Sequence, residues 1–477
     1  MRDKKKYWFG LLLLLGVGGS GIARETPDGL PASVKQALAQ AQIPLSGVSV
    51  MVQVVGEQSP RIGWNEQVPR LPASLMKLVT TYSALLKWGP TKTWVTRIWG
   101  QPPRGGVVSG NLYVQSEGDP SLSFERWQQL WRQLRNQGVR EIRGDVVIQG
   151  PAFATANPDP GAFDGLGYRA YNALPSPLDL ANRTMLLHVK PMADQITVYP
   201  EIHLPEVSLI TRVVGDPGPC PGDWKKDLSL QVQEEGKSAR ILLEGRLSLQ
   251  CQEKVLPLRV LDDLSWVDAL FRAAWHELGG AFTGHVVWGK IPADLPQLEE
   301  TRSSALATQI GWVNKDSNNL MARTLFLELG DREAPSMELT PVQANQEVKR
   351  LLGMRGMNFP ELVLENGSGL SRQEQLTPAH LNQLLQDAMQ NPLQAEFMAS
   401  LAWAGEEGTV LHRFNAPDLM RRFRLKTGSI QNVSALAGYG LNAKGQWVSL
   451  VFMVNDARAN ASGAAQEALL RWIAEQP

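Results

Sequence analysis

The sequence has few cysteines and histidines and no excess of charge of either sign. Its 477 residues include two cysteines and six histidines, and Lys plus Arg equals Asp plus Glu at 47 each. Balanced charge gives no overall attraction to nucleic acid or to an anionic membrane, so neither is an expected partner beyond peripheral membrane contact. The scattered histidines show no HExxH spacing and no GxSxG elbow. We therefore predict no metal, no cofactor and no Ser-His-Asp hydrolase.

The chain also lacks an apolar run that is long enough for an ordinary membrane span. The run from Tyr7 to Val17 is short against the roughly 20 residues that a span needs, and it lies between basic residues and small residues that end at Ala23. This layout predicts a secretory signal peptide over residues 1–23, cleaved near Ala23, and an exported, periplasmic protein. An uncleaved anchor is the alternative interpretation.

The two cysteines, Cys220 and Cys251, lie in one strand-rich stretch. In an exported protein they could form a disulfide, which would stabilise the fold by roughly 3–4 kcal/mol in the chain-entropy model. Two unpaired buried thiols are the other possibility, and the sequence leaves both open.

Alternating apolar patterns predict hairpin strands near both ends of the chain, which could share one antiparallel sheet. The middle of the chain has a different residue pattern, because short β-like runs with almost no helical signal replace the mixed helix and strand pattern around them. We predict an α+β protein whose main domain is interrupted by an inserted α+β domain that carries a nested all-β domain. The predicted boundaries are 24–96 and 291–477 for the main domain, 97–181 and 258–290 for the insertion, and 182–257 for the nested domain.

Fifteen tryptophans raise the question of carbohydrate stacking. Four of them lie in helical patterns that a packed core explains, and we predict that they are core residues: Trp127, Trp131, Trp266 and Trp275. The stretch GLGYRA at 165–170 matches half of a dinucleotide fingerprint but follows no strand, so we predict a loop there.

A predicted helix from Pro72 to Trp88 is apolar on nearly every side, which is typical of a core helix. Ser74 and Lys77 share one of its faces, because residues three apart are neighbours on a helix. Burying an ammonium group there is costly unless the charge is paired or lost, and this cost suggests a chemical role for the lysine.

Two later stretches supply the partners for this pair. Ser317 and Asn319 stand at the start of an apolar-periodic helix, and Lys426, Thr427 and Gly428 lie on a predicted strand. Together the three stretches give Ser-x-x-Lys, Ser-x-Asn and Lys-Thr-Gly in that order. This order is the signature of serine penicillin-recognising enzymes, in which a peptide or a β-lactam acylates the serine.

Each residue type suits one step of that chemistry. Ser74 is the predicted nucleophile, and Lys77 is the base that takes its proton, provided that desolvation and the nearby Lys426 keep the amine neutral. Ser317 can relay a proton to the leaving amine, and Asn319 can bind the substrate amide.

The Lys-Thr-Gly strand is predicted to bind the substrate. Lys426 and Thr427 can hold a carboxylate, and Gly428 leaves room for the substrate backbone to add as a strand. By analogy, the oxyanion hole would use the backbone N–H of Ser74 and that of Ser429 or Ile430.

The distance between motifs narrows the choice of family, because Ser-x-x-Lys and Ser-x-Asn stand much further apart in this sequence than in compact class A β-lactamases. The chain resembles the low-molecular-mass class C penicillin-binding proteins of peptidase family S13, the D-alanyl-D-alanine carboxypeptidases and endopeptidases of the type-4 group. Four further stretches carry the resemblance over the mature chain: GNLYVQSEGDPSLS, YNALPSPLDLANRT, ENGSGLSR and KTGSIQNVSALAGY. Asn318, where the family commonly has Asp, is the variable middle residue of Ser-x-Asn.

The resemblance implies a β-lactamase/transpeptidase-like domain, a periplasmic location, and peptidoglycan peptides and β-lactam antibiotics as binding partners. ENGSGLSR, around Asn366 to Arg372, resembles a family loop near the site, with a plain Gly-rich turn as the alternative. A serine β-lactamase-like hydrolase and a catalytically idle wall-binding protein are the competing functions. The sequence indicates neither an oligomeric state nor the balance of carboxypeptidase and endopeptidase activity.

Overall fold

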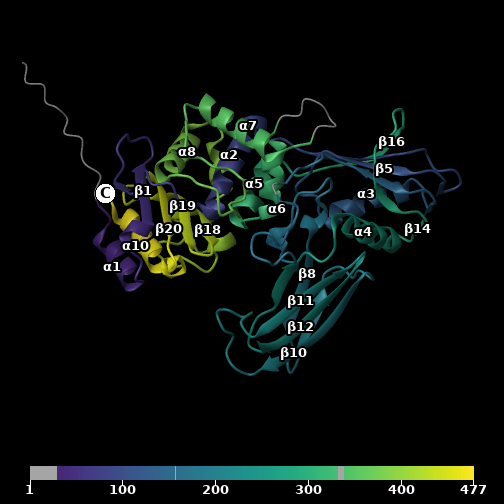
Figure 1. Ribbon diagram of the computed structural model, residues 1–477, viewed down its shortest axis with the longest axis horizontal. Helices are drawn as coiled ribbons and strands as arrows, with labels where there is room; N and C mark the ends of the chain where they lie inside the picture. Colours follow the sequence, from purple (N-terminus) through teal and green to yellow (C-terminus); the bar gives the residue numbers. More distant parts are fainter. Residues whose placement is uncertain (1–28, 156, 331–337) are drawn as a thin grey trace, which may run out of the picture.

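The computed structural model describes residues 29–155, 157–330 and 338–477 (Figure 1). The predicted signal peptide, residues 1–23, lies outside the described residues. The described chain is elongated: the sheet that contains β1 and β18 lies at one end, and the segments around β5, β14 and β16 lie at the other. Strands β8 and β10 to β12 project to one side of this long axis.

The described residues from both ends of the chain form one six-stranded sheet, in the order β17-β18-β19-β20-β1-β2. Strand β1 pairs with β20 in antiparallel register, so the two terminal hairpins share a sheet as predicted. The six strands are β1 (Val48–Val54), β2 (Ile62–Trp64), β17 (Ala402–Trp403), β18 (Phe423–Ile430), β19 (Val433–Leu441) and β20 (Trp447–Asn455).

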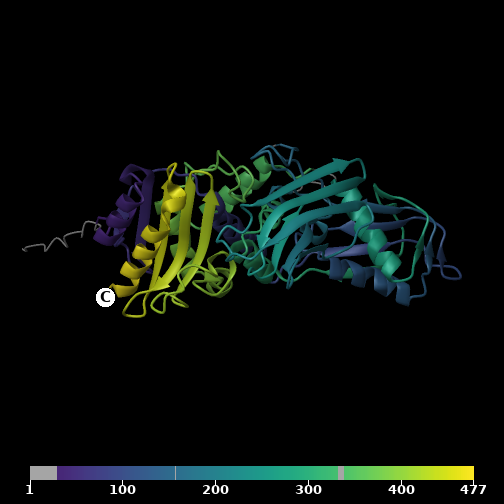
Figure 2. The ribbon, with the colours of Figure 1, turned by 90° about the horizontal axis from the view of Figure 1, so that it is seen from below.

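Both faces of this sheet are covered by helices, which explains the continuous apolar run in β20. Alternate side chains of β20 enter different cores: Leu450 and Phe452 pack with α1 and α10, whereas Val451 and Met453 pack with the helices on the other face. Figure 2 shows α10 running along one face of the strands. The helices are α1 (Ala32–Gln40), α10 (Gly463–Glu475), α2 (Met76–Trp88), α5 (Leu306–Lys315), α6 (Asn319–Glu328), α7 (Pro341–Met354), α8 (Pro378–Gln390) and α9 (Gln394–Ala399).

Between β3 and β16 the chain builds a separate core. A five-stranded sheet in the order β15-β7-β5-β3-β16 and a three-stranded sheet in the order β14-β6-β4 accompany α3 and α4. The four tryptophans of the sequence analysis are buried in this core, which confirms the packing interpretation. The elements are β3 (Val95–Trp99), β4 (Val107–Val108), β5 (Leu112–Ser116), α3 (Phe124–Asn136), β6 (Glu141–Ile142), β7 (Val146–Gln149), α4 (Asp263–Glu277), β14 (Ala281–Phe282), β15 (Val286–Trp288) and β16 (Gln297–Arg302).

The stretch with little helical signal forms two three-stranded sheets, β10-β12-β11 and β13-β8-β9. Cys220, in the loop after β10, forms a disulfide with Cys251, which follows β12; this settles the question that the sequence left open. The strands are β8 (Met185–Pro191), β9 (Ile196–Pro200), β10 (Val207–Asp216), β11 (Leu228–Glu235), β12 (Ser238–Ser248) and β13 (Lys254–Leu258).

The remaining regular elements are short 3-10 turns, and residues 165–170 form a loop that ends in one of them, as predicted. The predicted α+β class is confirmed. The 3-10 turns are Leu45–Gly47, Ala73–Leu75, Ala170–Asn172, Leu180–Arg183, Gly408–Val410 and Ala459–Ala461.

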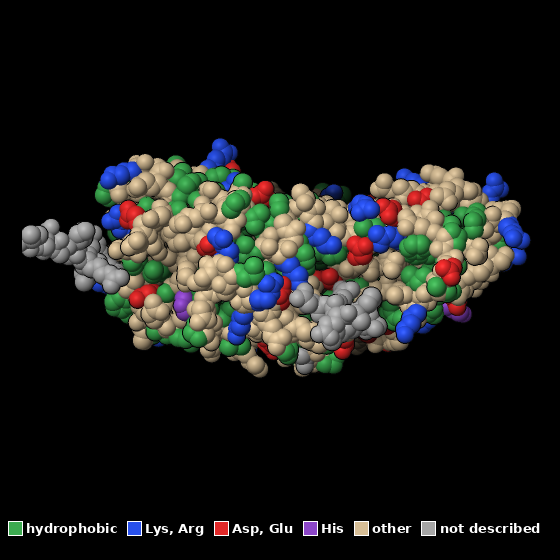
Figure 3. All heavy atoms as spheres, turned by 90° about the horizontal axis from the view of Figure 1, so that it is seen from above, with side chains coloured by type: hydrophobic (Ala, Val, Ile, Leu, Met, Phe, Trp, Pro, Cys, Tyr) green, Lys and Arg blue, Asp and Glu red, His purple; other side chains and the backbone are tan. Residues whose placement is uncertain are grey.

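The surface agrees with the balanced composition. In Figure 3, acidic and basic side chains are interspersed over the face that is seen from above. Within the described residues, no helix combines the length and the apolar character that crossing a membrane requires.

Candidate active site

Ser74 lies at the junction of a 3-10 turn and helix α2. The sequence predicted one helix from Pro72, but the α-helix begins at Met76, after a 3-10 turn over Ala73–Leu75. Ala73 has a positive φ of 46° there, which an L-residue adopts only under local constraint. The turn places Ser74, partly exposed, at the end of a buried helix.

Lys77 is fully buried, and its amine touches three acceptors. Nζ lies 3.0 Å from the Ser74 Oγ, 2.6 Å from the Asn319 Oδ1 and 2.5 Å from the carbonyl oxygen of Ser368. An ammonium group would donate to all three. A neutral amine has two hydrogens and one lone pair, so it would donate to Asn319 and Ser368 and accept the hydroxyl proton of Ser74. The geometry therefore suits a base that removes the proton of the Ser74 hydroxyl.

The surroundings favour the neutral form. Burial lowers the pKa of Lys77 well below its usual value, and the cationic Lys426 and Arg323 lower it further. Glu374 acts in the opposite direction, because its negative charge favours the ammonium.

Ser317 and Lys426 form the second cluster of the site. Ser317 has a positive φ of 59° just before α6, and the Lys426 Nζ donates to its Oγ at 3.0 Å. Nζ also donates to the carbonyl oxygen of Thr427 at 2.7 Å. Burial lowers the pKa of Lys426 to about 7, although the nearby Asp316 favours its charged form. Lys426 therefore titrates near neutral pH.

Asn319 links the two clusters, because it follows Ser317 in sequence and binds Lys77. Its Nδ2 donates to the backbone carbonyl of Tyr171 at 3.1 Å, which leaves one amide hydrogen available for a substrate carbonyl. The intervening Asn318 caps α6 by accepting from the N–H of Met321, and its Nδ2 lies 3.3 Å from the Asn182 Oδ1.

Strand β18 presents the remaining predicted residues. The Thr427 Oγ1 donates to the Thr409 Oγ1 at 2.7 Å, and Ser429 is exposed. A Cβ on Gly428 would lie 2.7 Å from the carbonyl oxygen of Pro72 and 3.2 Å from the N of Ser74. Only glycine therefore lets β18 approach the Ser74 turn this closely.

The ENGSGLSR loop contacts both Lys77 and the turn that contains Ser74. Its Ser368 carbonyl accepts from Lys77, and a Cβ on Gly369 would lie 1.9 Å from the carbonyl oxygen of Ala73. The loop is thus packed on the Ser74 turn. The resemblance to a family loop pointed to this segment, but nothing in the sequence indicated that a carbonyl would bind Lys77.

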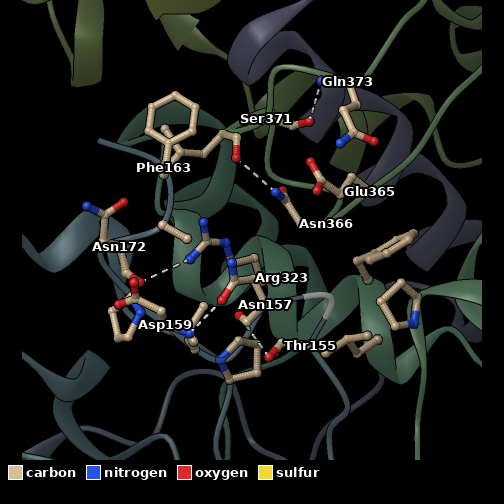
Figure 4. Close-up of a pocket in the computed structure, with 18 of the residues that line it drawn as sticks. Thr155, Asn157, Asp159, Phe163, Asn172, Arg323, Glu365, Asn366, Ser371 and Gln373 are labelled. Atoms are coloured by element: carbon tan, nitrogen blue, oxygen red, sulfur yellow. Dashed lines mark hydrogen bonds between the residues drawn. The ribbon is translucent and has the colours of Figure 1, made fainter. Parts of the chain in front are cut away.

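A second wall that sequence reasoning missed comes from residues 170–183. Its carbonyls at Asn172 and Ala173 accept from the buried Arg323 of α6, and its Asp179 accepts from the Thr324 hydroxyl at 2.7 Å. In Figure 4, Arg323 lies between Asn172 on one side and Glu365 and Asn366 on the other, and these residues line a cavity of about 270 Å³. A groove of about 750 Å³ adjoins Ser317 on the side of the insertion.

Residues 30–476 match the D-Ala-D-Ala carboxypeptidase 3 (S13) family. The chain belongs to this family. Among its members, the D-alanyl-D-alanine carboxypeptidase DacB of Haemophilus influenzae is 24% identical over 86% of this chain and 85% of its own length. The D-alanyl-D-alanine carboxypeptidase of Actinomadura sp. strain R39 is 28% identical over 90% of this chain and 81% of its own length.

Solved structures support the fold of this family member. The crystal structure of penicillin-binding protein 4 (dacB) from H. influenzae aligns with a TM-score of 0.75 at 23% identity, over 93% of this chain and 99% of that chain. The predatory peptidoglycan endopeptidase Bd3459 of Bdellovibrio bacteriovorus aligns with a TM-score of 0.53 at 14% identity, over 89% of this chain and 90% of that chain. As a family member that has the three motifs, the protein is a serine D,D-peptidase.

Proposed function

We propose that this family S13 enzyme acts on peptidoglycan stem peptides and their cross-links through an acyl-enzyme on Ser74, and that β-lactams acylate the same serine. The observation that carries the assignment is the 3.0 Å approach of the buried Lys77 amine to the Ser74 hydroxyl. The H. influenzae structural relative has been solved in complex with a β-lactam, which supports the second part.

The proposed reaction assigns one proton movement to each cluster. The neutral amine of Lys77 takes the proton of Ser74 as its Oγ attacks the substrate carbonyl carbon. The oxyanion is held by the backbone N–H groups of Ser74 and of Ser429 or Ile430. As the peptide C–N bond breaks, the proton that Lys77 has taken passes through the Ser317 hydroxyl to the leaving nitrogen, which returns the Lys77 amine to its neutral form. Water then hydrolyses the ester and restores Ser74.

The remaining residues bind the substrate. The free amide hydrogen of Asn319 would reach a substrate carbonyl, and Lys426 with Thr427 would hold the terminal carboxylate of the leaving D-amino acid. Gly428 allows the peptide to lie along β18, whose pairing with β17 involves only Arg424 and Leu425.

We further propose that segments 24–96 and 291–477 form the catalytic domain. Segments 97–181 and 258–290 would then form the insertion, and 182–257 its nested domain. Export through a signal peptide cleaved near Ala23 would place the enzyme in the periplasm with its substrate. The Cys220–Cys251 disulfide supports an oxidising compartment.

The test is the kinetics of intact mass with benzylpenicillin, followed by peptide mapping of the adduct. We expect a long-lived adduct on Ser74 and its loss in Ser74→Ala. Ser83→Ala is the matched control, because it makes the same substitution within α2, at a buried hydroxyl that has no hydrogen-bond partner in the described structure. Labelling that persists in Ser74→Ala would contradict the nucleophile assignment. Rapid turnover without an adduct would favour a serine β-lactamase-like hydrolase.

A further inference from the structure

One buried carboxylate near the site has no part in the reaction as proposed. Glu374 is 1% exposed, and its Oε1 accepts from three consecutive backbone N–H groups: Glu365 at 3.1 Å, Asn366 at 3.0 Å and Gly367 at 3.0 Å. Its Oε2 has no hydrogen-bond partner in the described structure. Burying a carboxylate in this way is costly, so the arrangement calls for a compensating function.

The segment that Glu374 holds leads directly to Lys77. Gly367 has a positive φ of 68°, and its carbonyl accepts from the Thr80 hydroxyl of α2 at 2.6 Å. The next carbonyl, that of Ser368, accepts from the Lys77 Nζ. The Asn366 side chain accepts from both the N–H and the hydroxyl of Ser368. The position of the Ser368 carbonyl therefore depends on the backbone that Glu374 fixes.

We propose that Glu374 is a positioning residue that fixes the Ser368 carbonyl on Lys77 and supplies a negative charge that acts on that amine. The inference rests on the proposed function, in which Lys77 is the base. Glu374 has two separable effects, one through the shape of the loop and one through charge. A side chain that only shaped the loop would produce the first effect without the second.

The charges around the two groups set the sign of the second effect. Lys77 faces Lys426 from β18 and Arg323 from α6, and both disfavour its protonation, whereas Glu374 favours it. Glu374 itself faces Glu365 on its own loop, the Lys77 amine and the cationic Arg323. Burial raises the pKa of Glu374, and the three N–H groups oppose that rise. Removing its charge therefore leaves Lys77 neutral at lower pH.

The decisive variants are Glu374→Gln and Glu374→Ala, studied by the rate constant of benzylpenicillin acylation from about pH 4 to 10. Gln keeps an oxygen for the three N–H groups and removes the charge, so we expect a maximal rate near that of the wild type and an acid limb shifted down on the order of one pH unit. Ala removes the charge and also releases the loop, so we expect the same shift of the acid limb together with a maximal rate that is lower by about ten-fold or more.

Thr80→Val is the matched control for loop anchoring without charge. It removes the hydroxyl that holds Gly367, so it should slow acylation and leave the acid limb where it is. Glu374→Asn is made alongside, as a second amide in case Gln does not fold. The rate constant reports only the acylating fraction, so partial misfolding lowers the amplitude and not the rate.

An unshifted acid limb in the folded amide variant would overturn the charge effect, and a wild-type rate in Glu374→Ala would overturn the positioning effect. The failure of the proposed function looks different, because Lys77→Ala would then acylate at the wild-type rate whatever stands at position 374.

Discussion

Two regions of the site contact the Asn319 side chain, one through a side-chain group and the other through a backbone group. On one side, the amine of Lys77 binds its side-chain oxygen. On the other, the segment 170–183 offers the backbone carbonyl of Tyr171 to its side-chain nitrogen. A reaction requires particular side chains at particular spacings, so the first region leaves a sequence signature. A backbone carbonyl is common to all residues, so no motif in the second region predicted this contact, although its sequence YNALPSPLDLANRT is one of the stretches that carry the family resemblance.

The largest expected effect tests the side-chain region. Lys77→Ala should slow the acylation of Ser74 by about 10²- to 10⁴-fold, because it removes the group that we propose as the base. Stopped-flow labelling with a fluorescent penicillin measures this rate. Lys87→Ala, near the end of the same helix, makes the same substitution away from Ser74 and should leave the rate close to that of the wild type. A fast Lys77→Ala enzyme would mean that another group is the base.

The next effect tests how closely β18 and the Ser74 turn must approach each other. Gly428→Ala should reduce the acylation rate by about 10²-fold, because the new Cβ meets the Pro72 carbonyl and pushes the turn away. Gly353→Ala, where nothing lies within 4 Å of the added atom, is the control. An unchanged rate would show that β18 need not lie this close to the serine.

A third prediction concerns stability and the second region. Burial raises the pKa of Asp179 to about 7, against 3.8 ordinarily, so the folded protein binds a proton there that the unfolded chain releases. This group therefore stabilises the fold fully below about pH 4, and its contribution is lost as the pH rises to about 7. Asp179→Asn should remove this pH dependence, which we expect to be roughly 2–4 kcal/mol. Urea unfolding of both proteins from pH 4 to 8 measures it, and parallel curves would contradict the assignment.

The smallest expected effect tests most directly whether the segment 170–183 acts through its backbone and not through its side chains. Tyr171→Phe should change the acylation rate by less than about two-fold, because Asn319 uses the backbone carbonyl and not the phenol. The lost hydroxyl donates to Asp164 at 2.8 Å, away from the reacting groups. Asn319→Ala is the contrasting variant and should be clearly slower. A large loss in Tyr171→Phe would show that the second region also acts through its side chains.

The same contrast explains which features of the fold and of the site could be predicted from the sequence. The shared terminal sheet, the core tryptophans and the α+β class followed from periodicity, and the three motifs pointed to residues that the fold brings together. The 3-10 turn at Ala73 and the positive φ angles at Ala181 and Arg183 could not be predicted, because neither residue type prefers that conformation. Glu374 lies in a polar stretch without periodicity, and its importance comes from contacts that only the folded loop creates. The domain boundaries and the residue roles remain predictions.

The pairing of β1 with β20 has a consequence for biosynthesis. A ribosome must finish β18, β19 and β20 before β1 has its neighbour, and Lys426 becomes part of the chain long after Ser74. A chain that lacks these last strands therefore lacks most of the sheet against which α2 packs. Ser74 and Lys426 can therefore come together only once nearly the whole chain is available.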